Sequence, residues 1–452
     1  MPEKDRFSLK IPCKKYPVVY NTPLCKGMLL THKGFFNAFG GVFMNILLVV
    51  SIAMIAGLLV SRLARLVRLP NVTAFLVAGL IIGPCVSGLI SEEQTKTMAV
   101  VSEAALGFIA YSIGAEFRLD HLKKIGKGPL IITASQGLAT ALLVDAGLIA
   151  LNLIFYKENA HGVPMSILLG AIALATAPAA TLMVVKQYKA HGPVTEMLLP
   201  VVAMDDALGL MVFSISASVA GGMLGGEITV KSMLLTPMIE IVGSLALGSA
   251  IGFALSMMCR FFHSRGNELG LSIAAVLGGV GLCDVLGLSS LLVCMMIGAV
   301  MVNMVDEDHR RTLIEQCDRF TPPVFLLFFV LSGAELDLTV LPQVGVIGVA
   351  YLLLRSLGKW SGTLAGAVMT KSDTNIKKYL GLTLLPQAGV AIGMANMVST
   401  RFGSDPSSEA MAKQINTIVL SGTLIFELIG PVITKIALKK AGEIDEASLV
   451  KN

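Results

Sequence analysis

Charged residues are scarce in this sequence. Asp, Glu, Lys and Arg make up 14% of the 452 residues, against about 25% in ordinary soluble domains. Hydrophobic residues make up 54%, and the mean hydropathy is +0.77. The net charge of +5 is spread over the loops and both ends, so the chain has no concentrated basic patch for nucleic acid. The composition predicts a protein embedded in a membrane.

Chemical motifs typical of enzymes and metalloproteins are also missing. The seven cysteines form no CxxC pair and lie mostly in apolar segments, where they are expected to act as small buried hydrophobes. No nucleophile with a neighbouring base and no metal-ligand spacing is present. We therefore expect neither an enzyme nor a bound cofactor. The polar first forty residues lack the apolar core of a signal peptide and are expected to form an N-terminal tail, residues 1–40.

Long apolar runs fill the rest of the chain. A membrane helix needs about 20 apolar residues, and runs of that length predict an all-α polytopic membrane protein with about thirteen spans. They form one transmembrane domain over residues 41–440, followed by a short tail at 441–452. The expected spans are 41–64, 71–91, 96–117, 129–156, 164–187, 194–222, 233–262, 267–285, 288–305, 321–339, 343–369, 377–400 and 413–438.

Basic residues alternate between rich and poor loops. The rich loops carry Arg62, Arg65, Arg68, Arg118, Lys123, Lys124, Lys127, Lys186, Lys189, Arg260, Arg265, Arg310, Arg311, Arg319, Lys371, Lys377 and Lys378. The poor loops carry Lys96, Lys157, Lys231, Arg401 and Lys413. Because cytoplasmic loops are enriched in Lys and Arg, this bias predicts a cytoplasmic C-terminus and an external N-terminus. The basic N-terminal tail disagrees, and the sustained loop bias outweighs it.

Two adjacent acidic residues interrupt the sixth apolar run. Asp205 and Asp206 stand in the sequence VVAMDDALGLMVF, which is otherwise uncharged. One central Asp costs roughly 2.5 to 3.5 kcal/mol even on lenient membrane-insertion scales, so the pair predicts a polar cavity, a cation or a bound proton. An acidic pair at a helix end near the lipid headgroups is the alternative at this stage.

Two pairs of segments, each seven spans apart, echo each other. Gly-Ala-Glu ends the third span at Glu116 and the tenth at Glu335. The fifth and twelfth spans each contain a mid-membrane proline among small residues, Pro178 and Pro386, where the missing N–H interrupts the helix. An odd offset places such segments in opposite orientations, which predicts an inverted repeat with broken helices beside a transport site. A chance match and ordinary proline kinks remain the alternatives.

The eleventh span supplies buried cation candidates. Arg355 and Lys359 are four residues apart and share one helix face, so either can turn towards the aspartates. Extension of the side chains to the headgroups is the other reading. Gln136, in the fourth span, is expected to serve as a hydrogen-bond donor between helices.

These residues resemble the monovalent cation:proton antiporter superfamily, and in particular its bacterial sodium/proton exchangers with a double-aspartate motif. The sequence LPNVTAFLVAGLIIGP at 69–84 is similar to the second-helix signature of that family. SGAELDL at 332–338 is similar to the end of its tenth helix, and ELIGP at 427–431 to its final helix. The Asp205–Asp206 pair is the most specific element of the match.

The resemblance implies a fold of two inverted repeats, about 41–222 and 267–438, joined by a linker helix at about 233–262, with two crossing proline-broken helices. It implies a homodimer with a rigid dimerisation domain and a mobile core. By position, Asp206 corresponds to the residue that binds Na⁺ or a proton, and Asp205 to its neighbour. Thr176 and Gln387 fall at the helix crossing. Many relatives have Asp where this chain has Ala177, so a ligand or dipole compensator is missing.

The resulting hypothesis is a secondary antiporter in the cell membrane that exchanges a monovalent cation for protons at a shared aspartate. Na⁺ is the first candidate, with Li⁺ and K⁺ as alternatives. A sodium-coupled symporter of an organic anion on the same broken helices is a second hypothesis. A membrane sensor without transport is a third, and it would be expected to carry a signalling domain.

Overall fold

The computed structural model describes residues 45–67, 69–120, 126–155, 161–225, 235–262, 264–305, 307–403 and 408–444. Within these ranges every regular element is helical, and no strand occurs. The predicted N-terminal tail at 1–40 lies outside the described residues, as do residues 445–452 of the tail predicted at 441–452. Residues 441–444 of that second tail are described, and Glu443 among them is buried. The described helices belong to one compact unit that begins at Asn45.

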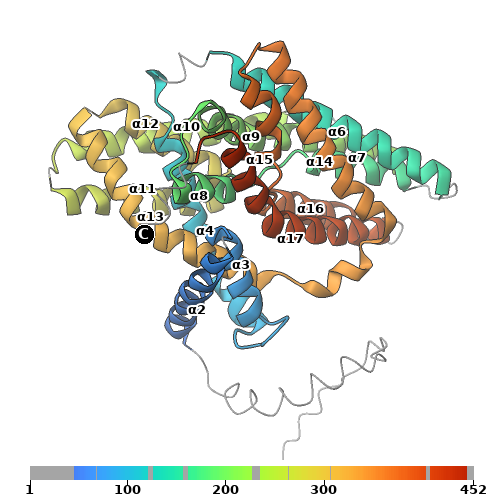
Figure 1. Cartoon of the computed structure of the whole chain (residues 1–452), viewed down its shortest axis with the longest axis horizontal. Coiled ribbons are helices and arrows are strands. Elements are labelled where there is room, and N and C mark those ends of the chain that lie inside the picture. Colours follow the sequence, from blue (N-terminus) through green and yellow to red (C-terminus); the bar gives the residue numbers. More distant parts are fainter. Residues whose placement is uncertain are drawn as a thin grey trace, which may run out of the picture. The chain divides into compact units, whose positions relative to one another are not determined.

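The helices follow most of the predicted spans (Figure 1). Two bounds differ: the helix that begins at Asn71 ends at Ile82 and not at residue 91, and the helix that ends at Glu335 begins at Glu307 and not at residue 321. In chain order the helices are α2 (Ile46–Leu66), α3 (Asn71–Ile82), α4 (Glu92–Ala115), α6 (Gly128–Phe155), α7 (Gly162–Ile172), α8 (Pro178–Tyr188), α9 (Pro193–Met223), α10 (Thr236–Cys259), α11 (Arg265–Leu286), α12 (Ser290–Met304), α13 (Glu307–Glu335), η2 (Leu338–Gln343), α14 (Gly345–Met369), η3 (Ile376–Leu380), α15 (Gly381–Thr383), α16 (Gly389–Phe402) and α17 (Glu409–Lys440).

Seven of the described helices are long and apolar enough to cross a membrane by length and composition. The all-α membrane class predicted from the sequence is thereby confirmed. The number of about thirteen crossings stays a prediction, because α3, α7 and α12 are shorter apolar helices. Two predicted spans, 164–187 and 377–400, are each divided into separate helical pieces.

The helices contribute to two separate hydrophobic clusters of buried side chains. One cluster joins residues of α6, α7, α9, α14, α16 and α17, and includes Leu148, Phe213 and Tyr351. The other joins residues of α4, α10, α11 and α12, and includes Val276, Cys294 and Ile297. The aspartate pair lies on α9, which also contributes Phe213 to the first cluster.

The glycine of each Gly-Ala-Glu echo lies where two helices make backbone contact. A Cβ atom on Gly333 of α13 would overlap the backbone of α3, and one on Gly114 of α4 would overlap the backbone of α12. The facing helices contribute Gly79 and Gly298 at the same contacts. Helices α3 and α13 are the second and tenth predicted spans, and α4 and α12 are the third and ninth. A repeat with an offset of seven spans relates the second span to the ninth and the third to the tenth. It therefore converts the α3–α13 contact into the α12–α4 contact, as an inverted repeat would.

A second row of glycines brings α14 against α6, which lie side by side in Figure 1. Gly358, Gly362 and Gly366 recur at intervals of four on α14, and an added Cβ on each would come within 2.9 Å of a Cα atom of α6. For Gly362 that atom belongs to Gln136. Small residues allow this close approach in membrane helices. The contact places the polar side chains of α14 and α6 in one narrow space.

Two interruptions divide the proline-containing spans. The first, residues 173–177, separates α7 from α8, and the second, residues 384–388, separates α15 from α16. Pro178 is the first residue of α8, where its missing N–H removes no helical hydrogen bond. The N–H of Ala177 donates to the carbonyl oxygen of Pro386 at 2.9 Å. The two interrupted segments therefore cross at these residues, as predicted.

Candidate ion-binding site

Both aspartates lie deep within α9. Asp205 is 1% exposed and Asp206 is 5% exposed. Pro200 lies inside the same helix, five residues before Asp205. These positions exclude the alternative of an acidic pair at a helix end near the headgroups. A carboxylate at this depth requires a partner, because an unpaired charge in an apolar interior is strongly unfavourable.

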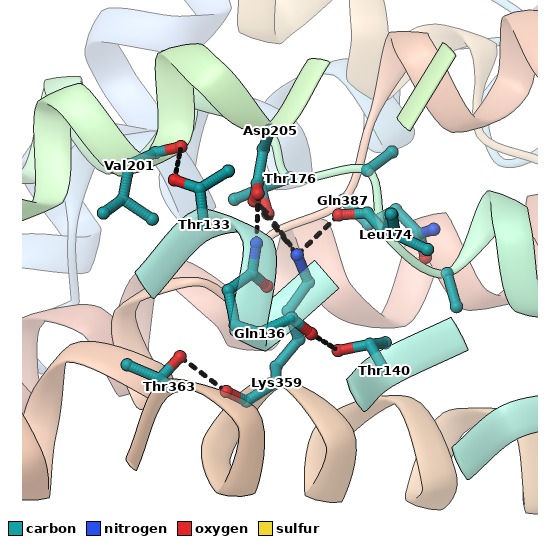
Figure 2. A network of polar contacts seen from close by, with 12 residues as sticks. Thr133, Gln136, Thr140, Leu174, Thr176, Val201, Asp205, Lys359, Thr363 and Gln387 are labelled. Atoms are coloured by element: carbon teal, nitrogen blue, oxygen red, sulfur yellow. Dashed lines mark hydrogen bonds and ion pairs between the residues drawn. The ribbon is translucent and has the colours of Figure 1, made fainter. Parts of the chain in front are cut away.

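Lys359 is the cationic partner of Asp205. Its ammonium nitrogen lies 3.1 Å from Oδ2 of Asp205, and both side chains are buried. The same nitrogen donates to the hydroxyl of Thr176 at 2.8 Å and to the carbonyl oxygen of Leu174 at 2.5 Å. Figure 2 shows the lysine reaching from α14 into this group. The alternative that Lys359 extends to the headgroups is therefore wrong.

Arg355 lies on the same face of α14 but has different partners. Its guanidinium donates to the carbonyl oxygens of Ala173 at 3.1 Å, Ala175 at 2.7 Å and Leu385 at 2.7 Å. The cation also lies 4.3 Å from the ring centroid of Phe426 in α17. Arg355 is fully buried, so extension to the headgroups is wrong here too. The arginine satisfies carbonyl groups released at both interruptions.

Thr176 connects the first interruption to the carboxylate. Its hydroxyl donates to Oδ2 of Asp205 at 2.7 Å, while it accepts from Lys359. The neighbouring Ala177 is extended and places no side-chain oxygen at the start of α8. Lys359, Thr176 and Asp205 thus form one closed polar group at the helix crossing.

Gln387 lies at the second interruption and, among the described residues, makes no hydrogen bond to either aspartate. Its amide donates to the carbonyl oxygen of Ile172 at 3.2 Å and to the hydroxyl of Tyr351 at 3.0 Å. Pro386 supplies the carbonyl that accepts from Ala177. These residues therefore support the crossing.

Helix α6 contributes a third side to the site. The amide nitrogen of Gln136 donates to Oδ1 of Asp205, and the hydroxyl of Thr133 donates to the carbonyl oxygen of Val201 at 3.4 Å. Figure 2 shows the Gln136 amide directed at the Asp205 carboxylate. Gln136 thus makes the interhelical hydrogen bond predicted for it. Both oxygens of Asp205 now have donors.

Asp206 differs from Asp205 in its hydrogen bonding. Its Oδ1 is buried and has no hydrogen-bond partner among the described residues. The side-chain oxygen of Gln136 is also buried without such a partner. A buried acceptor without a donor is unfavourable. A proton or a cation would satisfy the Asp206 oxygen.

The structure brings Asp205, Thr176 and Lys359 together and places Pro178, Pro386 and Arg355 at the crossing beside them. Within the described residues no group of three His, Cys, Asp or Glu side chains could hold a metal ion.

Two residues that contact the site, Tyr351 and Thr133, were not predicted from the sequence. Tyr351 precedes Arg355 by four residues, as Arg355 precedes Lys359, so its position on the same helix face was a usable signal.

The fold and the site define a class, a polytopic membrane transporter in which two interrupted helices cross beside buried carboxylates and cations. The model of the family described as "Sodium/hydrogen exchanger, transmembrane" matches residues 27–440, and the chain belongs to this family. Family membership confirms the resemblance to the monovalent cation:proton antiporter superfamily, whereas the subtype with a double-aspartate motif stays a prediction. The family is one of antiporters and not of enzymes.

Three curated relatives share this region. The chain is 26% identical to the high-affinity Na⁺/H⁺ antiporter NhaS3 of Synechocystis sp., over 70% of this chain and 68% of the relative. It is 24% identical to Na⁺/H⁺ antiporter 1 of Methanocaldococcus jannaschii, over 83% of this chain and 88% of the relative. It is 21% identical to the K⁺/H⁺ antiporter subunit KhtU of Bacillus subtilis, over 85% of this chain and 92% of the relative.

Solved structures show the same fold. The sodium proton antiporter MjNhaP1 of Methanocaldococcus jannaschii at pH 8 matches with a TM-score of 0.66 and 20% identity, over 91% of this chain and 99% of that chain. An electron-microscopy structure of MjNhaP1 matches with a TM-score of 0.71 and 21% identity, over 89% of this chain and 100% of that chain. At these identities the likeness extends to the fold alone.

Proposed function

We propose that the chain exchanges Na⁺ for protons by alternating access, with Asp206 as the shared binding residue. The observation that carries this proposal is the buried Asp206 oxygen that lacks a hydrogen-bond donor among the described residues. Asp205 next to it already has an ammonium, a hydroxyl and an amide as partners. The two aspartates therefore have unequal roles, and Asp206 is the one left to bind a proton or a cation.

Competition for one carboxylate is sufficient for exchange. A proton neutralises Asp206 by forming the O–H bond, whereas Na⁺ neutralises it by direct coordination, so the two ions exclude each other. A small hard cation prefers oxygen ligands, and the Asp206 carboxylate with water supplies them. When the loaded site opens alternately to each side of the membrane, each ion gradient drives the other.

Four carbonyl groups at the interruptions already accept hydrogen bonds from buried cations in this conformation. The carbonyl oxygens of Ala173, Ala175 and Leu385 accept from Arg355, and that of Leu174 accepts from Lys359. We propose that cation binding loosens the Lys359–Asp205–Thr176 group, so that Thr176 becomes a further oxygen ligand.

The proposal includes the predicted repeats, membrane orientation, dimer and transported cation. The paired contacts of α3 with α13 and of α4 with α12 support the repeats at 41–222 and 267–438 and a linker at 233–262. The basic loops support a cytoplasmic C-terminus in the cell membrane. The family resemblance supports a homodimer. Na⁺ is the proposed cation, with Li⁺ and K⁺ as the alternatives to be compared.

The test is a cation-dependent proton flux. The purified full chain is reconstituted into proteoliposomes that carry a pH gradient, and Na⁺, Li⁺, K⁺ or an organic anion with Na⁺ is added. We expect Na⁺ or Li⁺ alone to dissipate the gradient. A response that requires the organic anion would support the symporter, and the absence of any cation response would contradict the proposal.

A further inference from the structure

The segment that follows α17 folds back onto the protein. The chain turns at Gly442, whose φ of +77° lies in the left-handed region, and the N–H of Glu443 donates to the carbonyl oxygen of Leu438 at 3.0 Å. Glu443 is only 6% exposed. The side-chain amide of Asn375 donates to the carbonyl oxygen of Ala441 at 3.1 Å, which joins the same segment to the start of η3. A carboxylate is therefore held in a buried position immediately after the last helix.

The carboxylate of Glu443 caps the first turn of α9. Its Oε1 accepts from the N–H of Val194 at 2.7 Å, and its Oε2 accepts from the N–H of Thr195 at 2.8 Å and from the Thr195 hydroxyl at 2.7 Å. The N–H of His191 donates to the backbone oxygen of Glu443 at 3.1 Å. The first N–H groups of a helix have no partner within the helix, and an anion is favoured there. Glu443 supplies both the hydrogen bonds and the charge.

Helix α9 has no cap of its own. Its preceding residue is Gly192, which makes no side-chain cap and has a φ of +150° that disfavours other residues. A Cβ atom at Gly192 would lie 2.6 Å from the Cδ atom of Glu443. The absence of a side chain at Gly192 therefore makes room for the distant carboxylate.

The capped turn belongs to the helix that carries the ion-binding candidates. Pro200 has no N–H, so the carbonyl of Glu196 loses its helical donor, and the segment from Pro193 to Pro200 depends more on contacts from outside α9. Asp205 follows five residues later. The end of this segment that lies away from Asp205 is held by Glu443.

We propose that Glu443 is a positioning residue for ion exchange, which acts by fixing the start of α9 and so holding Asp205 against its partners and Asp206 beside it. This inference rests on the proposed Na⁺/H⁺ exchange. A loss of the cap frees the first turn of α9, and the helix backbone between Thr195 and Asp205 transmits the movement to the aspartates. The C-terminal segment thereby becomes part of the apparatus that sets cation affinity.

The test compares Glu443→Ala and Glu443→Gln with Ser264→Ala in the full chain, using Na⁺-driven proton flux in proteoliposomes. Ser264 caps α11 by accepting from the N–H of Asn267 at 3.2 Å, and α11 carries none of the proposed site residues. We expect Glu443→Ala to raise the KM for Na⁺ about three- to tenfold, in line with the usual strength of a helix cap. Glu443→Gln should raise it less, because one oxygen acceptor remains. Ser264→Ala should leave KM unchanged.

The possible outcomes separate a role of Glu443 in ion exchange from a role in stability alone. If the Glu443→Ala protein melts at a lower temperature but retains the wild-type KM, the cap serves stability alone and the inference is wrong. If that protein fails to accumulate, Glu443→Gln decides, and an unchanged KM in this variant overturns the inference. If wild-type protein shows no Na⁺-dependent flux, the proposed function itself fails, which is distinguishable from an active wild type with unaffected variants.

Discussion

The two helix interruptions are related by position but not by chemistry. Residues 173–177 bring the Thr176 hydroxyl to Asp205 and present carbonyl oxygens to Lys359 and Arg355. Residues 384–388 present the Leu385 carbonyl to Arg355 and direct Gln387 towards Tyr351. One interruption thus contacts the Asp205 carboxylate, and the other supports the crossing. We propose that the first serves ion binding and the second serves the fold.

The largest expected effect comes from the cation that joins the first interruption to the aspartate. Lys359→Met would leave Asp205 buried without its ammonium, and removal of one member of a buried ion pair typically costs about 3–5 kcal/mol. We expect a lower melting temperature in detergent and loss of antiport. Addition of Asp205→Asn should recover part of the stability, because the unpaired charge is removed. Additive losses in the double variant would contradict the pairing.

A smaller effect is expected from the threonine. Thr176→Val keeps the shape but removes the hydroxyl between Lys359 and Asp205, which corresponds to about 1–3 kcal/mol for a buried group left without its partner. We expect the KM for Na⁺ to rise about tenfold in proteoliposomes. Thr181→Val is the matched control, since the Thr181 hydroxyl is buried and donates to the Pro178 carbonyl at 2.9 Å. An equal change in both variants would remove the special role of Thr176.

The smallest effect on transport is expected at the second interruption. Gln387→Leu removes the hydrogen bonds to Tyr351 and to the Ile172 carbonyl, so the melting temperature should fall by an amount equivalent to about 1–2 kcal/mol. The KM for Na⁺ should change less than about twofold, because Gln387 donates to neither aspartate in the described contacts. Should KM rise as far as in Thr176→Val, the proposed division between the two interruptions would be wrong.

Much of this arrangement follows from the sequence because lipid restricts what a membrane helix can contain. Asp205, Asp206, Pro178 and Pro386 all conflict with a plain apolar helix, so each marks a site without knowledge of the fold. Family membership then confirms the class that these conflicts predict.

The allocation of partners could not be derived in the same way. Arg355 and Lys359 share a helix face, and only the crossing of two remote interruptions decides that the arginine meets carbonyls and the lysine meets Asp205. Glu443 is separated from Thr195 by 248 residues. A cap over such a separation has no local sequence signal, because its geometry depends on the turn after α17 that brings Glu443 to the start of α9.

The central claim is that Asp206 binds both transported ions. The most direct measurement is the Na⁺-driven proton flux of Asp206→Asn in proteoliposomes, with wild type as the reference and equal amounts of folded protein. Asn has nearly the same shape but neither the charge nor the titratable proton, so we predict that the flux falls to the level of protein-free vesicles. Retained cation-dependent flux in Asp206→Asn would contradict the account.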